Sequence, residues 1–267
     1  MKELSLRVEE LLNSQEISLM IGYRRNINGE IKPLIFSSPE MAERLVFNSD
    51  CKQNLIAYLN KPEIKAFKNI GIALNLTGLR SLLQLIAEKR FQGMNIIAFT
   101  FDNNAKLIQL NTSDEIENFI EMNYKKQIDE VFNKVQQLNA MTREERWDFW
   151  VDELKDCIKC YACRSVCPMC YCEKCSVECN NPQWVPTATH GQGNMEWHIM
   201  RAMHLAGRCV ECNECARACP MDIPLNLITA KLNQDIEADF GLLAGMKAKS
   251  DYALSSYKFE DKENFIR

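Results

Sequence analysis

The spacing of hydrophobic residues over the first 112 positions predicts a mixed α/β domain. Leucines and a valine recur at helical spacing over residues 3–13, which predicts a helix there. The segments ISLMIGY and IKPLIF predict two strands around a turn at Asn28-Gly29. The segment PEMAERLVF then predicts a short helix with Pro39 in its first turn.

A strand–helix–strand unit is predicted next. KNIGIALN is typical of a buried strand, Thr77-Gly78 of a turn, LRSLLQLIAEKRF of a helix and NIIAFTF of a second strand. Such units have a right-handed crossover and parallel strands, so we expect a parallel sheet. KLIQL predicts an additional edge strand.

The rest of the chain is predicted to be helical. Thr112 with Glu115 fits a capping box, and apolar residues at helical spacing then predict one connector helix over residues 113–140. Thr142 with Glu145 predicts the start of another helix. Its inner face is predicted to contain Trp147, Trp150, Val151 and Leu154.

Two further helices and a tail complete the prediction. GNMEWHIMRAMHLAGR predicts a helix that ends before Gly207, and LNLITAKLNQDIEADF predicts another. The inner face of the former is predicted to contain Met195, Ile199, Ala202, Met203 and Ala206. We therefore expect an α/β docking domain (1–112), a connector helix (113–140), a mainly α domain (141–249) and an extended tail (250–267) that lies on this chain or on a partner.

Composition is that of an ordinary globular protein, with 46% hydrophobic and 25% charged residues. No apolar run is long enough for a membrane span, and the first residues lack the apolar core of a signal peptide, so a cytoplasmic location is expected. The net charge of -4 comes without a basic stripe, which argues against a nucleic-acid partner.

Cysteine is the unusual component. Twelve of the thirteen cysteines lie between Cys157 and Cys219, and in a chain of this size without a signal peptide such density favours metal binding over disulfides. The pattern CxxCxxCxxxCP occurs twice, starting at Cys157 and at Cys209. This is the pattern of bacterial ferredoxins with two [4Fe-4S] clusters.

The spacing also predicts which cysteines share a cluster. Three thiolates on a tight loop can face three iron corners of one cube, whereas the fourth cysteine, before the proline, reaches the other cube. One cluster is therefore assigned to Cys157, Cys160, Cys163 and Cys219. The other is assigned to Cys209, Cys212, Cys215 and Cys167. Two zinc sites are the alternative, although zinc sites usually show CxxC pairs without the third cysteine and the CP step.

A further group of four cysteines lies between the motifs. Cys170, Cys172, Cys175 and Cys179 fall within ten residues. They could bind a third [4Fe-4S] cluster or zinc, or form a reduced loop over the two clusters. The spacing leaves these alternatives open.

Other side chains in this region have weaker chemical signals. His190, His198 and His204 are candidate ligands or proton carriers, but histidines that pack in or project from a helix are commoner. Cys51 is isolated and is expected to be a small buried side chain. The four tryptophans are expected to shield the clusters from water, namely Trp147, Trp150, Trp184 and Trp197.

The separation of the two motifs resembles that of a particular ferredoxin class. Forty-two positions separate Cys167 from Cys209, and a predicted helix lies between them. This is similar to the α-helical ferredoxin domain of the iron–sulfur subunits of succinate dehydrogenase and heterodisulfide reductase. The fold class expected is an α/β N-terminal domain followed by a mainly α, α-helical ferredoxin-type iron–sulfur domain.

A closer resemblance comes from WDELKDCIKCYACRSVCPMCYCEKC, NNPQWVPT and GNMEWHIMRAMHLAGRCVECNECARACPMDIPL. These segments resemble dicluster iron–sulfur subunits related to the beta subunits of formate dehydrogenase and of deazaflavin-reducing hydrogenase. The resemblance implies a multi-subunit anaerobic complex. In it the chain would relay electrons between a formate dehydrogenase or hydrogenase catalytic subunit and a flavoprotein of the heterodisulfide reductase type.

Catalysis by the chain itself is not expected. Relatives often have a Gly-Cys-Asp turn where this chain has Leu76, Thr77 and Gly78, and no GxGxxG or P-loop is present. We therefore expect a non-catalytic electron-transfer subunit without flavin and without catalytic residues. The alternative is an oxidoreductase beta subunit that binds a flavin or deazaflavin in its N-terminal domain.

Overall fold

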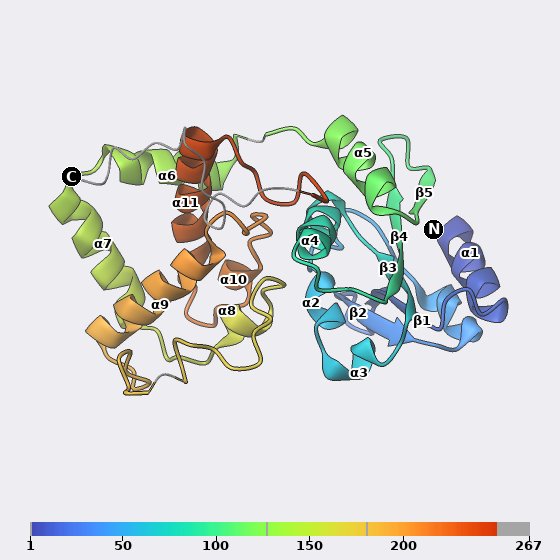
Figure 1. The fold of residues 1–267 in the computed structure, drawn as a ribbon, viewed down its shortest axis with the longest axis horizontal. Coiled ribbons are helices and arrows are strands. Elements are labelled where there is room, and N and C mark those ends of the chain that lie inside the picture. Colours follow the sequence, from blue (N-terminus) through green and yellow to red (C-terminus); the bar gives the residue numbers. More distant parts are fainter. Residues whose placement is uncertain (1, 127, 180, 250–267) are drawn as a thin grey trace. The chain divides into compact units, whose positions relative to one another are not determined.

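The computed structural model describes residues 2–126, 128–179 and 181–249. Within these residues the chain divides into two compact units (Figure 1). Of the described residues, the first unit comprises 2–124 and 245–249, and the second comprises those between 125 and 244. The boundary therefore lies after Tyr124, later than the predicted boundary at 112. The predicted tail, 250–267, lies outside the described residues.

The first unit is built around a five-stranded sheet with strand order β2-β1-β3-β4-β5. Its elements are α1 (Lys2–Asn13), β1 (Leu19–Arg25), β2 (Ile31–Phe36), the 3-10 helix η1 (Pro39–Arg44), α2 (Ile56–Leu59), α3 (Pro62–Lys65), β3 (Asn69–Ala73), α4 (Leu76–Ala87), β4 (Asn95–Phe101), β5 (Leu107–Leu110) and α5 (Ser113–Asn123). Strands β1, β3 and β4 are parallel, whereas β2 and β5 are antiparallel edge strands. The predicted α/β domain, its hairpin and its edge strand are thus present.

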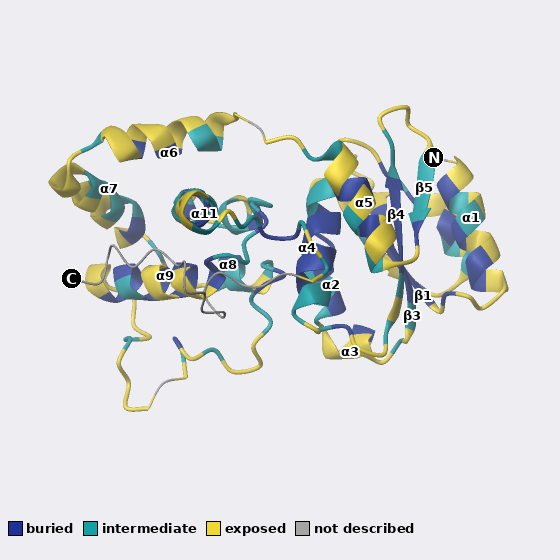
Figure 2. Ribbon diagram, turned by 45° about the horizontal axis from the view of Figure 1, so that its top comes forward, coloured by how far each residue is buried: buried dark blue, intermediate teal, exposed yellow. Residues whose placement is uncertain are grey.

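Helices cover both faces of this sheet. Helix α1 lies on one side, and α4 and α5 lie on the other (Figures 1 and 2). The first five residues of β1 are all buried, as expected for a strand covered on both faces. Helix α4 is buried along most of its length (Figure 2).

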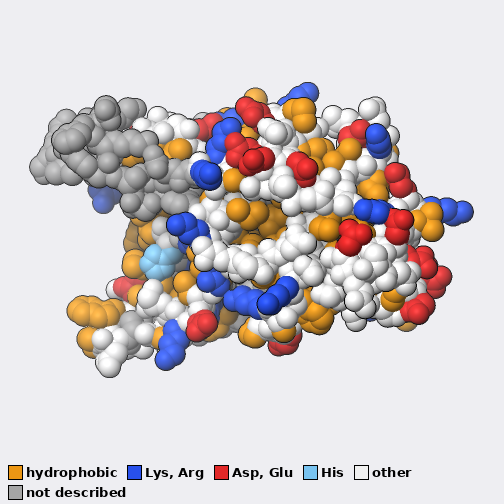
Figure 3. Space-filling view, turned by 45° about the vertical axis from the view of Figure 1, so that its right-hand side comes forward, with side chains coloured by type: hydrophobic (Ala, Val, Ile, Leu, Met, Phe, Trp, Pro, Cys, Tyr) orange, Lys and Arg blue, Asp and Glu red, His pale blue; other side chains and the backbone are white. Residues whose placement is uncertain are grey.

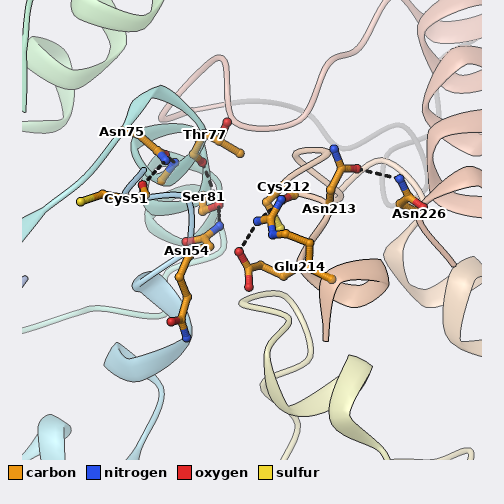
Figure 4. A network of polar contacts seen from close by, with 12 residues as sticks. Cys51, Asn54, Asn75, Thr77, Ser81, Cys212, Asn213, Glu214 and Asn226 are labelled. Atoms are coloured by element: carbon orange, nitrogen blue, oxygen red, sulfur yellow. Dashed lines mark hydrogen bonds and ion pairs between the residues drawn. The ribbon is translucent and has the colours of Figure 1, made fainter. Parts of the chain in front are cut away.

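The predicted turn at Thr77-Gly78 is wrong, because both residues lie in the first turn of α4. Asn75 caps this helix: its side chain accepts a hydrogen bond from the Gly78 nitrogen at 2.9 Å and donates to the Cys51 carbonyl at 3.2 Å (Figure 4). Cys51 is buried, as predicted. The cap and the cysteine segment therefore fix the chain immediately after β3.

The second unit is helical. Its elements are α6 (Glu130–Ala140), α7 (Arg143–Lys155), α8 (Ala162–Ser165), α9 (Gly191–Leu205), α10 (Glu214–Arg217) and α11 (Leu225–Phe240). Helix α9 packs against α7 and α11, α11 also packs against α6, and the single turns α8 and α10 contact each other. Both predicted capping boxes are present, at Thr112 with Glu115 and at Thr142 with Glu145.

The single connector helix over 113–140 is wrong, because two helices, α5 and α6, occupy this range. The first ends at Tyr124, whose ring lies under the Arg80 guanidinium at 4.7 Å within the first unit. The second begins at Asp129, whose carboxylate accepts from the Phe132 nitrogen at 2.9 Å. The apolar spacing continued across the break because each helix has its own buried face.

Two predicted inner faces are also partly wrong. On α7, Leu154 is buried but Trp147 and Val151 are exposed. On α9, Met195 and Ala202 are buried, whereas Ile199 and Met203 are exposed. Part of the buried face of α9 is instead occupied by the polar side chains of Asn194, His198 and Arg201.

The described residues can be compared with what a membrane span requires, and the charges on one face of the molecule can be seen directly. None of their helices combines the length and hydrophobicity that crossing a bilayer requires. On the face drawn in Figure 3, basic and acidic side chains lie beside one another.

Residues 245–249 return to the first unit after the helical unit is complete. The Gly245 nitrogen donates to Gln84 Oε1 at 2.9 Å, and the Ala248 nitrogen donates to Glu117 Oε2 at 2.8 Å. Lys247 adds an ion pair with Glu117 at 3.0 Å. The backbone hydrogen bond from Ala248, and next the bond from Lys247, lower the pKa of Glu117. A short C-terminal segment thus closes over α4 and α5.

Alanine at position 245 is expected to release this segment. Gly245 has φ +71°, and an added Cβ would overlap the Arg80 carbonyl. The left-handed backbone alone costs a non-glycine residue about 1–2 kcal/mol. Gly93→Ala is the matched control, because Gly93 has φ +78° and open space around its Cβ position. Compared with Gly93→Ala, Gly245→Ala should unfold at a clearly lower temperature and should be cleaved faster after residue 244. Equal unfolding temperatures and cleavage rates in the two variants would contradict the packing role.

Candidate iron–sulfur centre

The two cysteine motifs adopt the same backbone conformation. In the first loop Lys159 and Tyr161 have φ of 49° and 59°, and in the second Glu211 and Asn213, at the same motif positions, have φ of 61° and 60°. Non-glycine residues with such angles are uncommon. Turns of this kind can direct successive N–H groups to one side, which favours an anionic group there. The matching pairs therefore indicate that both loops are shaped for the same kind of ligand.

Each loop leads into a single helical turn, α8 or α10. In the second loop the left-handed Asn213 is held from outside, because its Oδ1 accepts from Asn226 Nδ2 on α11 at 3.1 Å (Figure 4). The Cys212 carbonyl accepts from Arg217 at 2.8 Å (Figure 4). Helix α11 and the turn α10 thus fix the second loop.

The first cysteine group surrounds a small cavity. The cavity is lined by Cys157, Cys160, Cys163 and Cys219, together with Pro220, Trp197 and His198. Cys219 belongs to the second motif but lies with three cysteines of the first. The indole nitrogen of Trp197 is buried and has no hydrogen-bond partner among the described residues. A buried donor without a partner in this lining suits an acceptor such as a cluster sulfide.

The second cysteine group shows the reciprocal arrangement. After burial, Cys167 and then Cys209 contribute most to raising the pKa of Cys212, which reaches about 12. Burial also raises the pKa of Cys215, with Cys209, Cys167 and Cys212 adding to the effect. Cys167 of the first motif therefore lies among the three cysteines of the second. These neighbours are compatible with crossed ligation, which stays a prediction.

Burial makes a free thiolate costly at Cys163 in the first group and at Cys209 in the second. It raises the pKa of Cys163 to about 11, and that of Cys209 to about 11. Metal ligation requires deprotonated cysteine, so the positive charge of iron must offset this cost when a cluster binds. Binding and local folding are for this reason expected to be coupled.

His198 lies beside the predicted ligand Cys157. Its Nε2 lies 3.2 Å from Cys157 Sγ, and its side chain is buried. Burial, and next the charges of Arg201 and Lys159, lower the pKa of His198 to about 3, so the imidazole is neutral. Since a ligating thiolate can only accept, His198 would donate Nε2–H to it and orient Cys157. The Trp197 ring packs edge-on against His198 at 4.9 Å.

Two asparagines hold the first cysteine of each motif. Asn194 Nδ2, on α9, donates to the Cys157 carbonyl at 2.9 Å, and Asn233 Nδ2, on α11, donates to the Cys209 carbonyl at 2.7 Å. Both asparagines are buried. The two long helices thus position the two motifs through the same kind of contact.

The four cysteines of the predicted third site differ in their surroundings. The thiol of Cys170 hydrogen-bonds to Cys167, which lowers the pKa of Cys167 to about 6 and raises that of Cys170. Cys175 packs against the core of the unit, whereas Cys172 and Cys179 are exposed. The third site stays a prediction.

Only two of the four tryptophans lie where they could shield the cysteine groups from water, as predicted. Trp197 is buried in the core around the first group, and Trp150 packs against that core. Trp147 and Trp184 are 58% and 76% exposed, so their predicted shielding role is wrong for the chain by itself. Trp147 lines an open pocket together with residues of α6 and α11, and Trp184 lies in the loop before α9.

Sequence reasoning missed two important residues of this site, Asn194 and Arg201, and gave His198 as a candidate ligand or proton carrier while favouring a packed or solvated helix histidine. All three lie on α9 at spacings of four and three residues. They therefore form a polar stripe along the buried side of that helix. A polar stripe at helical spacing between two metal motifs was the signal that could have identified them.

The geometry of a single-ion site is absent from the described residues: no three His, Cys, Asp or Glu side chains converge as the ligands of one ion do. The ligands of an iron–sulfur cube bind separate iron corners. A cluster therefore requires cysteines that face a common space, as the first group does around its cavity.

Comparison with known proteins gives partial relatives. No family model matches the chain. Over 107 residues it is 35% identical to the F420-dependent formate dehydrogenase subunit beta of Methanocaldococcus jannaschii, a stretch that covers 38% of this chain and 26% of the relative. Over 105 residues it is 31% identical to the F420-dependent formate dehydrogenase 1 subunit beta of Methanococcus maripaludis, covering 39% and 26%. The chain is thus similar, over about a quarter of their length, to beta subunits of F420-dependent formate dehydrogenases.

Proposed function

We propose that this chain is an iron–sulfur electron-transfer subunit of a formate dehydrogenase or hydrogenase complex. It would carry two [4Fe-4S] clusters and pass electrons between the catalytic subunit and a flavoprotein of the heterodisulfide reductase type. The observation that carries the proposal is the crossed grouping of Cys219 with the first motif and Cys167 with the second. The similarity to formate dehydrogenase beta subunits supports the choice of complex.

The roles of the residues follow from their positions. The eight motif cysteines would hold the clusters, and such clusters accept and release single electrons. Trp197, Ile223 and Leu225 line the first group and exclude water from it. His198 orients Cys157, while Asn194 and Asn233 fix the loops. None of these residues is required to break a bond in a substrate.

Metal analysis of the anaerobically purified chain tests the proposal. Two clusters predict about eight irons per chain, no zinc and a broad iron–sulfur absorption, whereas a third cluster would give about twelve irons. Zinc without iron would contradict the proposal. Purification from the native host should recover the catalytic subunit and the flavoprotein; recovery of the iron-loaded chain alone would contradict the proposed partners.

A pocket in the first unit favours the second candidate function, a flavin- or deazaflavin-binding oxidoreductase beta subunit. A cavity of about 520 Å³ lies where β3 and β4 end. Open α/β sheets often bind ligands at the carboxyl ends of their strands. Its lining includes Phe47, Asn48, Asn75, Phe101 and Phe119. Acid extraction separates the two functions: one flavin released per chain would establish the second, and none from an iron-loaded chain would favour the first.

A further inference from the structure

Arg201 is a buried cation on α9 that has no carboxylate partner among the residues the structure describes. Its side chain is 6% exposed, and within the described residues it forms no ion pair. Its Nη2 donates to the Cys163 carbonyl at 3.0 Å, and its Nε has no hydrogen-bond partner among those residues. Burying a charge is costly unless opposite charge lies nearby. The position of Arg201 therefore needs an anionic neighbour.

The neighbours of the guanidinium are cysteine sulfurs. Burial lowers the pKa of Arg201, but Cys170, Cys167, Cys163 and Cys215 outweigh it and raise the pKa overall. Cys163 belongs to the first cysteine group, and Cys167 and Cys215 belong to the second. The hydrogen bond to the Cys163 carbonyl places the guanidinium beside the first group, and its charge also interacts with Cys167 and Cys215 of the second.

Other cations near the motifs are engaged elsewhere. Lys159 is also buried, but its ammonium donates to the Pro186 carbonyl. Arg217 forms an ion pair with Glu214 and donates to the Cys212 carbonyl. Among these three cations, Arg201 is the one whose charge faces thiols of both groups with no carboxylate against it.

We propose that Arg201 sets the reduction potentials of both clusters by placing a fixed, buried positive charge within electrostatic range of both cysteine groups. The inference rests on the proposed function, because it requires clusters at both groups. Reduction brings one electron from an external donor to a cluster, breaks no bond and adds one negative charge. A buried cation stabilises the more negative state, so it raises the potential. Arg201 would thereby make both clusters easier to reduce.

Three variants of the full-length chain test this inference. Arg201→Gln removes the charge but keeps a donor for the Cys163 carbonyl, and Arg201→Lys keeps the charge. Lys134→Met is the control, because it removes one positive charge from α6, where Lys134 is half exposed and pairs with Glu130. After anaerobic reconstitution, iron content is measured first. Each sample is then titrated with dithionite while electron paramagnetic resonance records both clusters.

Arg201→Gln is expected to make both clusters at least tenfold harder to reduce, which is about 59 mV for a one-electron couple. Arg201→Lys should shift both potentials less, and Lys134→Met should leave them unchanged. A Gln variant with full iron and unchanged potentials would overturn the inference. A shift as large in Lys134→Met would overturn it too, because the effect would then be one of net charge.

Iron content covers the case in which a variant fails to assemble. Loss of iron in Arg201→Gln with full iron in Arg201→Lys would support the role of the charge. Loss of iron in both would show that only the packing of arginine matters and would overturn the inference. Absence of iron in the wild-type chain would contradict the proposed function itself, before any variant is considered.

Discussion

Alanine at Cys219 is expected to remove the cluster of the first motif and to leave that of the second in place. Cys219 lines the cavity formed with Cys157, Cys160 and Cys163, although it lies in the other motif. Iron should fall from about eight to about four atoms per chain, since one of two cubes is lost. Cys167→Ala should give the same iron content by removing the other cluster, and Cys51→Ala should keep all of the iron.

Double variants decide between crossed and uncrossed ligation. If the ligation is crossed, Cys219→Ala with Cys157→Ala still affects one cluster and should retain about four irons. Cys219→Ala with Cys209→Ala should then affect both clusters and retain almost none. The uncrossed arrangement predicts the reverse pair of results. The reverse pair would therefore contradict the ligand assignment while leaving the presence of iron–sulfur clusters intact.

Asn194→Ala is expected to destabilise the helical unit by about 2–3 kcal/mol, since several buried carbonyls lose a donor. Asn194 is fully buried, and its Nδ2 donates to the carbonyls of Leu154 at 3.1 Å, Lys155 at 3.4 Å and Cys157 at 2.9 Å. These carbonyls lie where α7 ends and the first motif begins. Denaturant unfolding should show the loss, and a chelator should remove iron from the first cluster faster than from the second.

Gln192 provides the control on the same helix. Its exposed side chain bonds Glu196 at 2.9 Å, and Gln192→Ala should change the free energy of unfolding by less than about 0.5 kcal/mol. Asn194→Asp should lower the free energy of unfolding more than Asn194→Ala, because it loses the donor and adds a negative charge beside Cys157. If Asn194→Ala unfolded like Gln192→Ala, helix α9 would not hold the first motif in the way described.

Local sequence signals predicted the elements of the first unit well. The strands follow from short apolar runs, and the edge strand β5 and both capping boxes depend on a few neighbouring residues. The break between α5 and α6 was missed, because helical spacing continues through it. It depends on Tyr124 contacting Arg80, more than forty positions away, which no local pattern records. The Asp129 cap was a local signal for the break that the apolar spacing outweighed.

The CxxCxxCxxxCP spacing limits what one loop can reach, so it predicts crossed ligation, which the double variants test. The surroundings of the cysteines were not predicted. Arg201 and Asn194 were missed, because polar residues at helical spacing are equally typical of the solvent-facing side of a helix. Their burial arises only when α9 packs against α7 and α11, so it is a property of the tertiary fold. The same packing places Ile199 and Met203 on the exposed side.

The return of residues 245–249 to the first unit has a consequence for biosynthesis. The helical unit is an insertion within the α/β unit, so the ribosome must add the whole insertion before the closing segment exists. At 5–20 residues per second, those 120 residues take roughly 6–24 s. Throughout that interval the faces of α4 and α5 that accept Gly245 and Ala248 are uncovered. The nascent sheet unit is thus finished only after the cysteine loops have been made.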